Sequence, residues 1–67
     1  MTKLLRLKQV TEATGLSRSS IYALAKVGRF PRPIKLTEKA SAWLEEEVRE
    51  WIISRIARSR NPQSTAI

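Results

Sequence analysis

A short run of hydroxyl-bearing and basic side chains holds the residues best suited to bind a ligand. The candidates are Ser17, Arg18, Ser19, Ser20, Tyr22 and Lys26. Arginine can donate a forked pair of hydrogen bonds to a guanine edge or to phosphate, and hydroxyl groups can contact either. No acidic residue occurs between Ser17 and Ile34, so the cations of this run are not balanced locally. This combination predicts contact with double-stranded DNA.

The residue types that most enzymes and metal sites need are missing. The chain has no histidine, cysteine or aspartate, which leaves six glutamates as its only side-chain carboxylates. Three of them are adjacent, at Glu45, Glu46 and Glu47, where they suit the positive end of a helix better than catalysis. We therefore expect a protein that is not an enzyme, with no cofactor, metal or small-molecule substrate.

The positive charge is unevenly placed. The formal charge is +7, and residues 1–36 hold eight Lys or Arg against one acid, Glu12, whereas residues 37–67 hold five of each sign. A polyanionic partner explains this asymmetry, with nucleic acid favoured over an anionic membrane surface. Charge that serves only solubility is the alternative. No run of about 18 apolar residues occurs, and residues 1–6 are too short for a signal peptide, so we expect a cytoplasmic protein.

Two short helices joined by a tight turn must position the candidate residues. Leu7, Val10 and Ala13 have the spacing of a buried stripe and predict a first helix at about residues 8–14. Gly15 can adopt the left-handed conformation that ends a helix, and Ser17 can cap the next one. The pattern is typical of a helix-turn-helix.

The second helix is expected to span about residues 17–27. Its apolar residues, Ile21, Leu24 and Ala25, cluster in one arc that should face the core, which leaves the hydroxylated and basic arc outward. Two residues have alternative interpretations. Ser20 could be an auxiliary cap, and Tyr22 could pack on the edge of the core instead of touching DNA.

A proline-rich segment follows and favours a β-hairpin. Pro31 and Pro33 exclude a helix, and Ile34 and Leu36 alternate with Lys35 as in a half-buried strand. A return strand at residues 40–43 would complete a wing at about residues 33–43. The basic residues that such a wing could bring to phosphate are Arg29, Arg32, Lys35 and Lys39. An ordinary connector with solvated charges is the alternative.

The last helix is predicted at about residues 45–58. Its apolar stripe, Val48, Trp51, Ile52 and Ile56, should complete the core, with Trp43 and Trp51 as the largest contributors. Ile53 falls off this stripe and is either a lone exposed residue or part of a self-association surface. Residues 1–60 thus form one domain, mainly α with a small β-hairpin, and residues 61–67 a flexible tail.

Three stretches together resemble the AlpA family of small phage and prophage DNA-binding regulators. They are Leu5–Val10, Thr14–Tyr22 and Gly28–Leu36, and the similarity continues through Glu38–Val48 and Glu50–Ile52. The resemblance implies a winged helix-turn-helix of the MerR/excisionase type. In that fold the second helix enters the major groove and the wing lies on the backbone or minor groove.

The resemblance also assigns roles by position. It implies recognition-helix contacts at Arg18, Ser19, Ser20 and Tyr22, and wing contacts at Arg32, Lys35 and Lys39. Two positions depart from the family pattern. Lys39 occupies a place where arginine is common, which removes a bidentate phosphate contact but keeps the charge, and Glu46 occupies one where serine is common.

We therefore expect a nucleoid-associated, sequence-specific double-stranded DNA-binding protein, of bacterial or phage origin, that regulates transcription of prophage or mobile-element genes. The alternative role is that of an excisionase that assists an integrase. A small RNA-binding protein is a further alternative, although the few aromatic residues offer little for stacking. A second copy of the chain, or an integrase, could be a protein partner.

Overall fold

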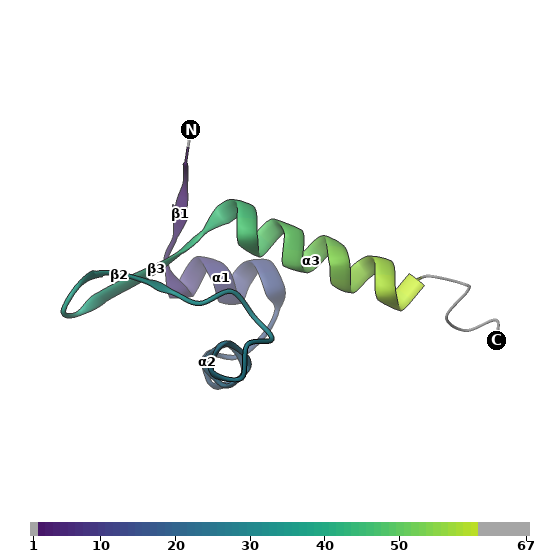
Figure 1. Ribbon diagram of the computed structural model, residues 1–67, viewed down its shortest axis with the longest axis horizontal. Helices are drawn as coiled ribbons and strands as arrows, with labels where there is room; N and C mark the ends of the chain where they lie inside the picture. The colour runs from purple at the N-terminus through teal and green to yellow at the C-terminus, as the bar shows by residue number, and fades with distance from the viewer. Residues whose placement is uncertain (1, 61–67) are drawn as a thin grey trace.

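The computed structural model describes residues 2–60, which form three helices and three short strands (Figure 1). In chain order these are β1 (Leu4–Leu5), α1 (Leu7–Thr14), α2 (Arg18–Lys26), β2 (Ile34–Thr37), β3 (Ala40–Leu44) and α3 (Glu45–Arg60). The expected mainly α fold with a β-hairpin is confirmed, and it is consistent with a winged helix-turn-helix. The proposed tail, residues 61–67, lies outside the described residues.

The sheet has one more strand than the sequence indicated. Its order is β1-β3-β2, and both pairings are antiparallel. In β1, Leu4 is opposite Leu44 and Leu5 is opposite Trp43, so the amino-terminal segment is tied to the end of the hairpin. Two residues are too short to show strand periodicity, so the pattern of the sequence predicts no strand at this place.

The turn between α1 and α2 is held by local hydrogen bonds. Gly15 has a φ of 76°, and its N–H donates to the Thr11 carbonyl at 2.8 Å, which ends α1. The Thr14 hydroxyl accepts from the Leu16 N–H at 3.2 Å, and the half-buried Leu16 side chain packs against the core. These contacts fix the angle at which α2 leaves the turn.

A second glycine ends α2. Gly28 has a φ of 79°, its N–H donates to Ala25, and the Arg29 N–H donates to Leu24 at 2.8 Å. This pair of bonds is a Schellman motif, in which only the residue after the helix needs a left-handed conformation. The expected bounds of 17–27 include the flanking cap residues Ser17 and Val27, so the helix itself runs from Arg18 to Lys26.

The core lies between the two short helices, α3 and strand β3. Its fully buried side chains with the largest volumes are Trp43, Ile21, Val10 and Val48. Trp43 is the large core residue that the sequence predicted. Trp51 is only partly buried and packs against this cluster from one side.

Four predicted burials are wrong. Ile34 and Leu36 are 38% and 45% exposed because β2 is an edge strand, whereas α1 and α3 pack against β3. Ala13 is exposed because α3 does not cover it. Two surface hollows lie between Ala13 on α1 and Ile52 on α3, and both residues line each hollow. Ile56 is 48% exposed because it lies on the outer half of α3.

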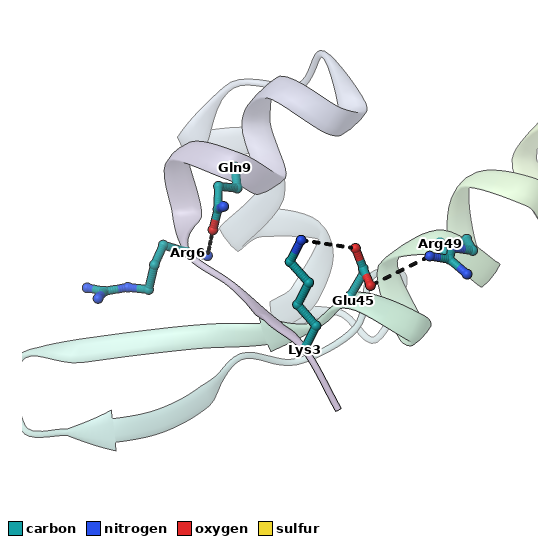
Figure 2. Close-up of polar contacts among 5 residues, drawn as sticks. All are labelled: Lys3, Arg6, Gln9, Glu45 and Arg49. Atoms are coloured by element: carbon teal, nitrogen blue, oxygen red, sulfur yellow. Dashed lines mark hydrogen bonds and ion pairs between the residues drawn. The ribbon is translucent and has the colours of Figure 1, made fainter. Parts of the chain in front are cut away.

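Helix α3 continues directly from β3 and ends two residues later than expected. The Glu45 N–H donates to the Lys3 carbonyl at 2.9 Å, which gives the first turn a backbone partner. Figure 2 shows the Glu45 carboxylate between Lys3 and Arg49, at 3.9 and 3.6 Å. These ion pairs are solvent-exposed and contribute little stability on their own. Within residues 2–60, no helix is long and apolar enough to cross a membrane.

Candidate nucleic-acid interface

Helix α2 turns one side to the core and the other to solvent. Ile21 is fully buried and Ala25 nearly so, which fixes the rotation of the helix about its axis. Because residues three and four apart share a side, the buried pair leaves the opposite arc free. The candidates that this places in the exposed class are Arg18, Ser19, Tyr22 and Lys26. The predicted outward arc is therefore available to a ligand.

Two of the predicted contact residues have a structural role as well. The Ser17 hydroxyl accepts a hydrogen bond from the Ser20 N–H at 3.2 Å, as the helix cap should. The same hydroxyl donates to the Ser20 hydroxyl at 3.0 Å. Ser20 is half-buried, and both its backbone N–H and its hydroxyl are bonded to the cap residue Ser17. Any contact that either hydroxyl makes with DNA would have to share these bonds.

Tyr22 belongs to the core edge and to the surface at once. Its ring centroid lies 5.9 Å from that of Trp43 at an interplanar angle of 56°, which is a tilted aromatic contact. Yet 47% of the residue remains exposed. Trp43 thus fixes the position of the Tyr22 ring, while the exposed part of Tyr22 can contact a ligand.

A surface hollow connects α2 with the segment before the wing. It is lined by Tyr22, Ala25, Lys26, Arg32 and Pro33. This brings together three predicted contact residues from two separate parts of the chain: the tyrosine, the lysine and the arginine. Two cations beside an exposed hydroxyl-bearing ring form an arrangement that suits a phosphate group.

The proline-rich connector is anchored by indole groups. The Trp43 N–H donates to the Pro31 carbonyl at 2.9 Å, and the Trp51 N–H donates to the Arg29 carbonyl at 2.7 Å. Between these points Phe30 is buried, with its ring in an edge-on contact with Trp51 at 4.8 Å. A segment without regular structure is thereby fixed, and with it the position of Arg32.

The hairpin carries the remaining predicted contacts. Lys35 is opposite Ser41 on β3, Lys39 lies in the β2–β3 turn, and both are exposed. The Lys39 N–H donates to the Thr37 hydroxyl at 3.2 Å, which orders the turn. The hairpin extends from the body of the domain as a wing does (Figure 1).

Arg29 does not line the hollow that Lys26 and Arg32 share. It borders a hollow on the side of α3, whose lining also includes Glu47, Glu50 and Arg58. Its carbonyl accepts from Trp51, so its backbone has a structural role. Nearby carboxylates make it a weaker candidate for phosphate than Arg32.

Most of the acidic side chains lie on α3. Four of the six glutamates belong to the start of α3, at Glu45, Glu46, Glu47 and Glu50, whereas α2 carries none. We use the term cationic face for the exposed set Arg18, Ser19, Tyr22, Lys26, Arg32, Lys35 and Lys39. The face carries five cations, and Glu38 is adjacent to one of them, Lys39, so its net charge is positive and attracts a polyanion.

Arg6 is an exposed cation that the predicted contacts left out. Its backbone N–H donates to the Gln9 side chain at 2.8 Å, at the start of α1. In Figure 2 its guanidinium extends away from the group formed by Lys3, Glu45 and Arg49. It takes no part in an ion pair within residues 2–60. Arg6 lies in the nearly acid-free first half of the chain, and this position could have marked it as an unpaired cation in the sequence.

Comparison with known proteins gives a consistent result. The sequence model of the family described as "Prophage CP4-57 regulatory protein (AlpA)" matches residues 3–56. The chain is also similar to "Uncharacterized protein ORF88" of Enterobacteria phage P4, with 46% identity over 55 residues, which is 82% of this chain. It spans 62% of the length of that relative. No solved structure matches the chain.

Proposed function

The chain belongs to the AlpA family of prophage regulatory proteins, and from that premise we propose that it is a sequence-specific DNA-binding regulator. Its ligand is double-stranded DNA of a prophage or another mobile element. Helix α2 reads base edges in the major groove, and the wing contacts the neighbouring backbone or minor groove. No catalysis is part of this role.

The observation that carries the proposal is the cationic face itself. Helix α2 exposes Arg18, Ser19, Tyr22 and Lys26 on one arc while Ile21 and Ala25 are buried behind them. The diameter of an α-helix with its side chains fits the major groove, which is about 12 Å wide. Arg18, near the amino end of α2, is in the part of a recognition helix that commonly approaches the bases.

The wing and the connector supply charge beside that helix. The hollow shared by Lys26 and Arg32 places a helix cation next to a connector cation. Lys35 and Lys39 continue the charge along the hairpin. Contacts of this kind position a protein on the duplex and provide much of its affinity, while α2 provides the sequence preference.

The distribution of aromatic rings favours duplex DNA over single-stranded RNA. Recognition of single strands depends on several exposed rings on which bases stack. Here Phe30 and Trp43 are buried, and the indole N–H of the half-buried Trp51 is bonded to the connector. Tyr22 alone among the four aromatic residues is in the exposed class.

The test is selection of bound sequences from a random pool of DNA duplexes, followed by affinity measurements on the selected site. We expect one enriched motif, bound at least about a thousandfold more tightly than unrelated duplex. Structured RNA should compete no better than unrelated DNA. Equal affinity for all duplexes would contradict the sequence specificity and indicate a non-specific DNA-binding protein. Preferential competition by RNA would overturn the proposal as a whole.

Regulation of transcription and assistance to an integrase would use the same DNA contacts. Footprinting on DNA of the element separates the two roles. Protection of promoters alone supports the regulator, whereas protection of the attachment site together with a stimulated excision reaction supports the excisionase.

A further inference from the structure

Helix α3 carries exposed isoleucines that the DNA-binding role does not use. Ile53 is 56% and Ile56 is 48% exposed. Two apolar hollows border them: one lined in part by Leu16, Leu24 and Ile56, the other in part by Leu5 and Ile53. In Figure 1 the outer half of α3 projects from the domain, on the side away from the wing. A projecting helix end with an apolar side is an unpartnered surface.

The charges on α3 are ordered along its length. Its first turn holds three glutamates, Glu45, Glu46 and Glu47, and its last turn holds Arg58 and Arg60. A second helix that carries the same order and lies antiparallel would bring acid opposite base at both ends. The two helix dipoles would also be opposed, which is favourable. A parallel arrangement would instead bring like charges together.

The residues concerned share one side of the helix. Glu46 lies two turns before Ile53 and Arg60 lies two turns after it, at the heptad spacing that keeps side chains on one stripe. Arg49 and Ile56 lie beside this line. We call this set, namely Glu46, Arg49, Ile53, Ile56 and Arg60, the α3 stripe. Within residues 2–60, neither Glu46 nor Arg60 takes part in an ion pair.

We propose that the α3 stripe is the interface with a second copy of this chain, formed by antiparallel pairing of two α3 helices about a two-fold axis at Ile53. In this register Glu46 of each copy faces Arg60 of the other, and the two Ile53 side chains meet at the centre. Each surface is self-complementary, as a two-fold interface requires.

The pairing leaves the cationic face free. Helix α2 and the hairpin lie elsewhere on the domain (Figure 1). Self-association through α3 can therefore be measured without DNA. Its outcome does not depend on whether the proposed DNA-binding function is correct. One pair of 16-residue helices buries less surface than a standard interface, so the dimer should depend strongly on concentration.

Sedimentation velocity on the full chain is the first test, from ~10 µM to ~1 mM, a range that covers dissociation constants up to the millimolar class. The wild-type chain should shift from monomer towards dimer. Ile53→Glu should remain monomeric, whereas Ser54→Glu, the same change about 100° further round α3 and outside the α3 stripe, should behave as wild type. Glu46→Arg and Arg60→Glu should each weaken association, and the double variant should restore it.

Cysteine cross-linking tests the orientation, because the chain has no cysteine of its own. Under oxidation, Ile53→Cys should form a disulfide-linked dimer at least tenfold faster than Ser54→Cys, since only residues near the axis come within disulfide reach. Glu46→Cys mixed with Arg60→Cys should form the mixed dimer in preference to either self-dimer.

Two results would overturn the proposal. One is a sedimentation coefficient that stays monomeric across the whole range, together with equal cross-linking of Ile53→Cys and Ser54→Cys. The other is preferential self-dimers of Glu46→Cys and Arg60→Cys in the mixture, which would indicate parallel helices.

Discussion

The indole N–H of Trp43 donates a 2.9 Å hydrogen bond to the carbonyl oxygen of Pro31. Trp43 is fully buried in β3, whereas Pro31 belongs to the connector that leads from α2 to the wing. The bond therefore ties a segment without regular secondary structure to the centre of the core. The neighbour of Pro31 is Arg32, so the core helps to position a residue of the cationic face.

Trp43→Phe should weaken both stability and DNA binding. The substitution keeps an aromatic ring but leaves the part-buried Pro31 carbonyl without its donor, which should cost about 1–3 kcal/mol of unfolding free energy. The smaller ring also leaves space in the core where the indole was fully buried, so the total loss should be larger. Because Arg32 is then less well positioned, affinity for DNA should fall as well. Thermal unfolding and a binding titration on folded protein measure the two effects.

Trp51→Phe is the matched control. It removes a similar bond, from Trp51 to the Arg29 carbonyl at 2.7 Å, on the α3 side of the connector. We expect a smaller loss of stability, because Trp51 is only partly buried, and a smaller loss of DNA affinity, because Arg29 is not part of the cationic face. Equal losses of affinity in the two variants would mean that the Pro31 bond has no special connection with binding.

Arg18→Ala should weaken binding to the preferred DNA site by about 1–3 kcal/mol and relax the sequence preference. The reason is that a forked arginine contact discriminates between bases, whereas a phosphate contact does not. Titrations on the selected site and on a site with one altered base pair measure both quantities.

Arg58→Ala removes the same charge from α3, outside the cationic face, and should change affinity much less. If Arg18→Ala weakened all sequences equally, Arg18 would be a phosphate contact instead of a base contact. If both variants lost the same affinity, net charge alone would account for the effect.

Arg32→Gln should reduce the salt dependence of binding. Each phosphate contact contributes about one unit to the slope of log affinity against log salt concentration, so the loss of one contact should lower the slope by about 1. Arg29→Gln is the paired variant of the same connector, and because it lies near Glu47 and Glu50 we expect little change. Equal slopes for the two variants would remove the distinction that the structure makes between these arginines.

Gly15→Ala should destabilise the turn between α1 and α2 through its backbone alone. Gly15 has a φ of 76°, and a Cβ at this position would meet nothing within 4 Å. The left-handed conformation should cost an alanine about 1–2 kcal/mol, whereas asparagine adopts it more readily. Thermal unfolding should therefore rank Gly15→Asn above Gly15→Ala, and the reverse order would point to a contact of the side chain.

Much of this fold is readable from the sequence because local chemistry determines it. Gly15, Ser17 and Gly28 set the ends of the two short helices, and the structure places each where the capping rules predict. The hairpin was expected from the prolines and the alternation of Ile34, Lys35 and Leu36. Its existence is confirmed, although the burial inferred from that alternation is wrong.

The features that the sequence did not reveal depend on distant parts of the chain. Leu4 and Leu5 pair with β3 across about forty intervening residues, and nothing local marks so short a strand. The exposure of Ile34 follows from the order of strands, which places β2 at the edge. The separation of Arg29 from Arg32 likewise needs the two indole bonds, which no spacing in the sequence predicts.

Ser17 allows the cap of α2 and its nearness to DNA to be tested separately. Its hydroxyl accepts the Ser20 N–H, and asparagine and aspartate serve equally well as caps, so Ser17→Asn and Ser17→Asp should both keep near wild-type stability. Only aspartate adds a negative charge at the amino end of the proposed recognition helix.

A carboxylate about 4 Å from a phosphate is repelled by ~1 kcal/mol in water, so Ser17→Asp should bind DNA at least about fivefold more weakly than Ser17→Asn. The difference should shrink as salt screens the repulsion. Equal affinities at low salt would place the amino end of α2 away from the DNA backbone, and would contradict the proposed docking.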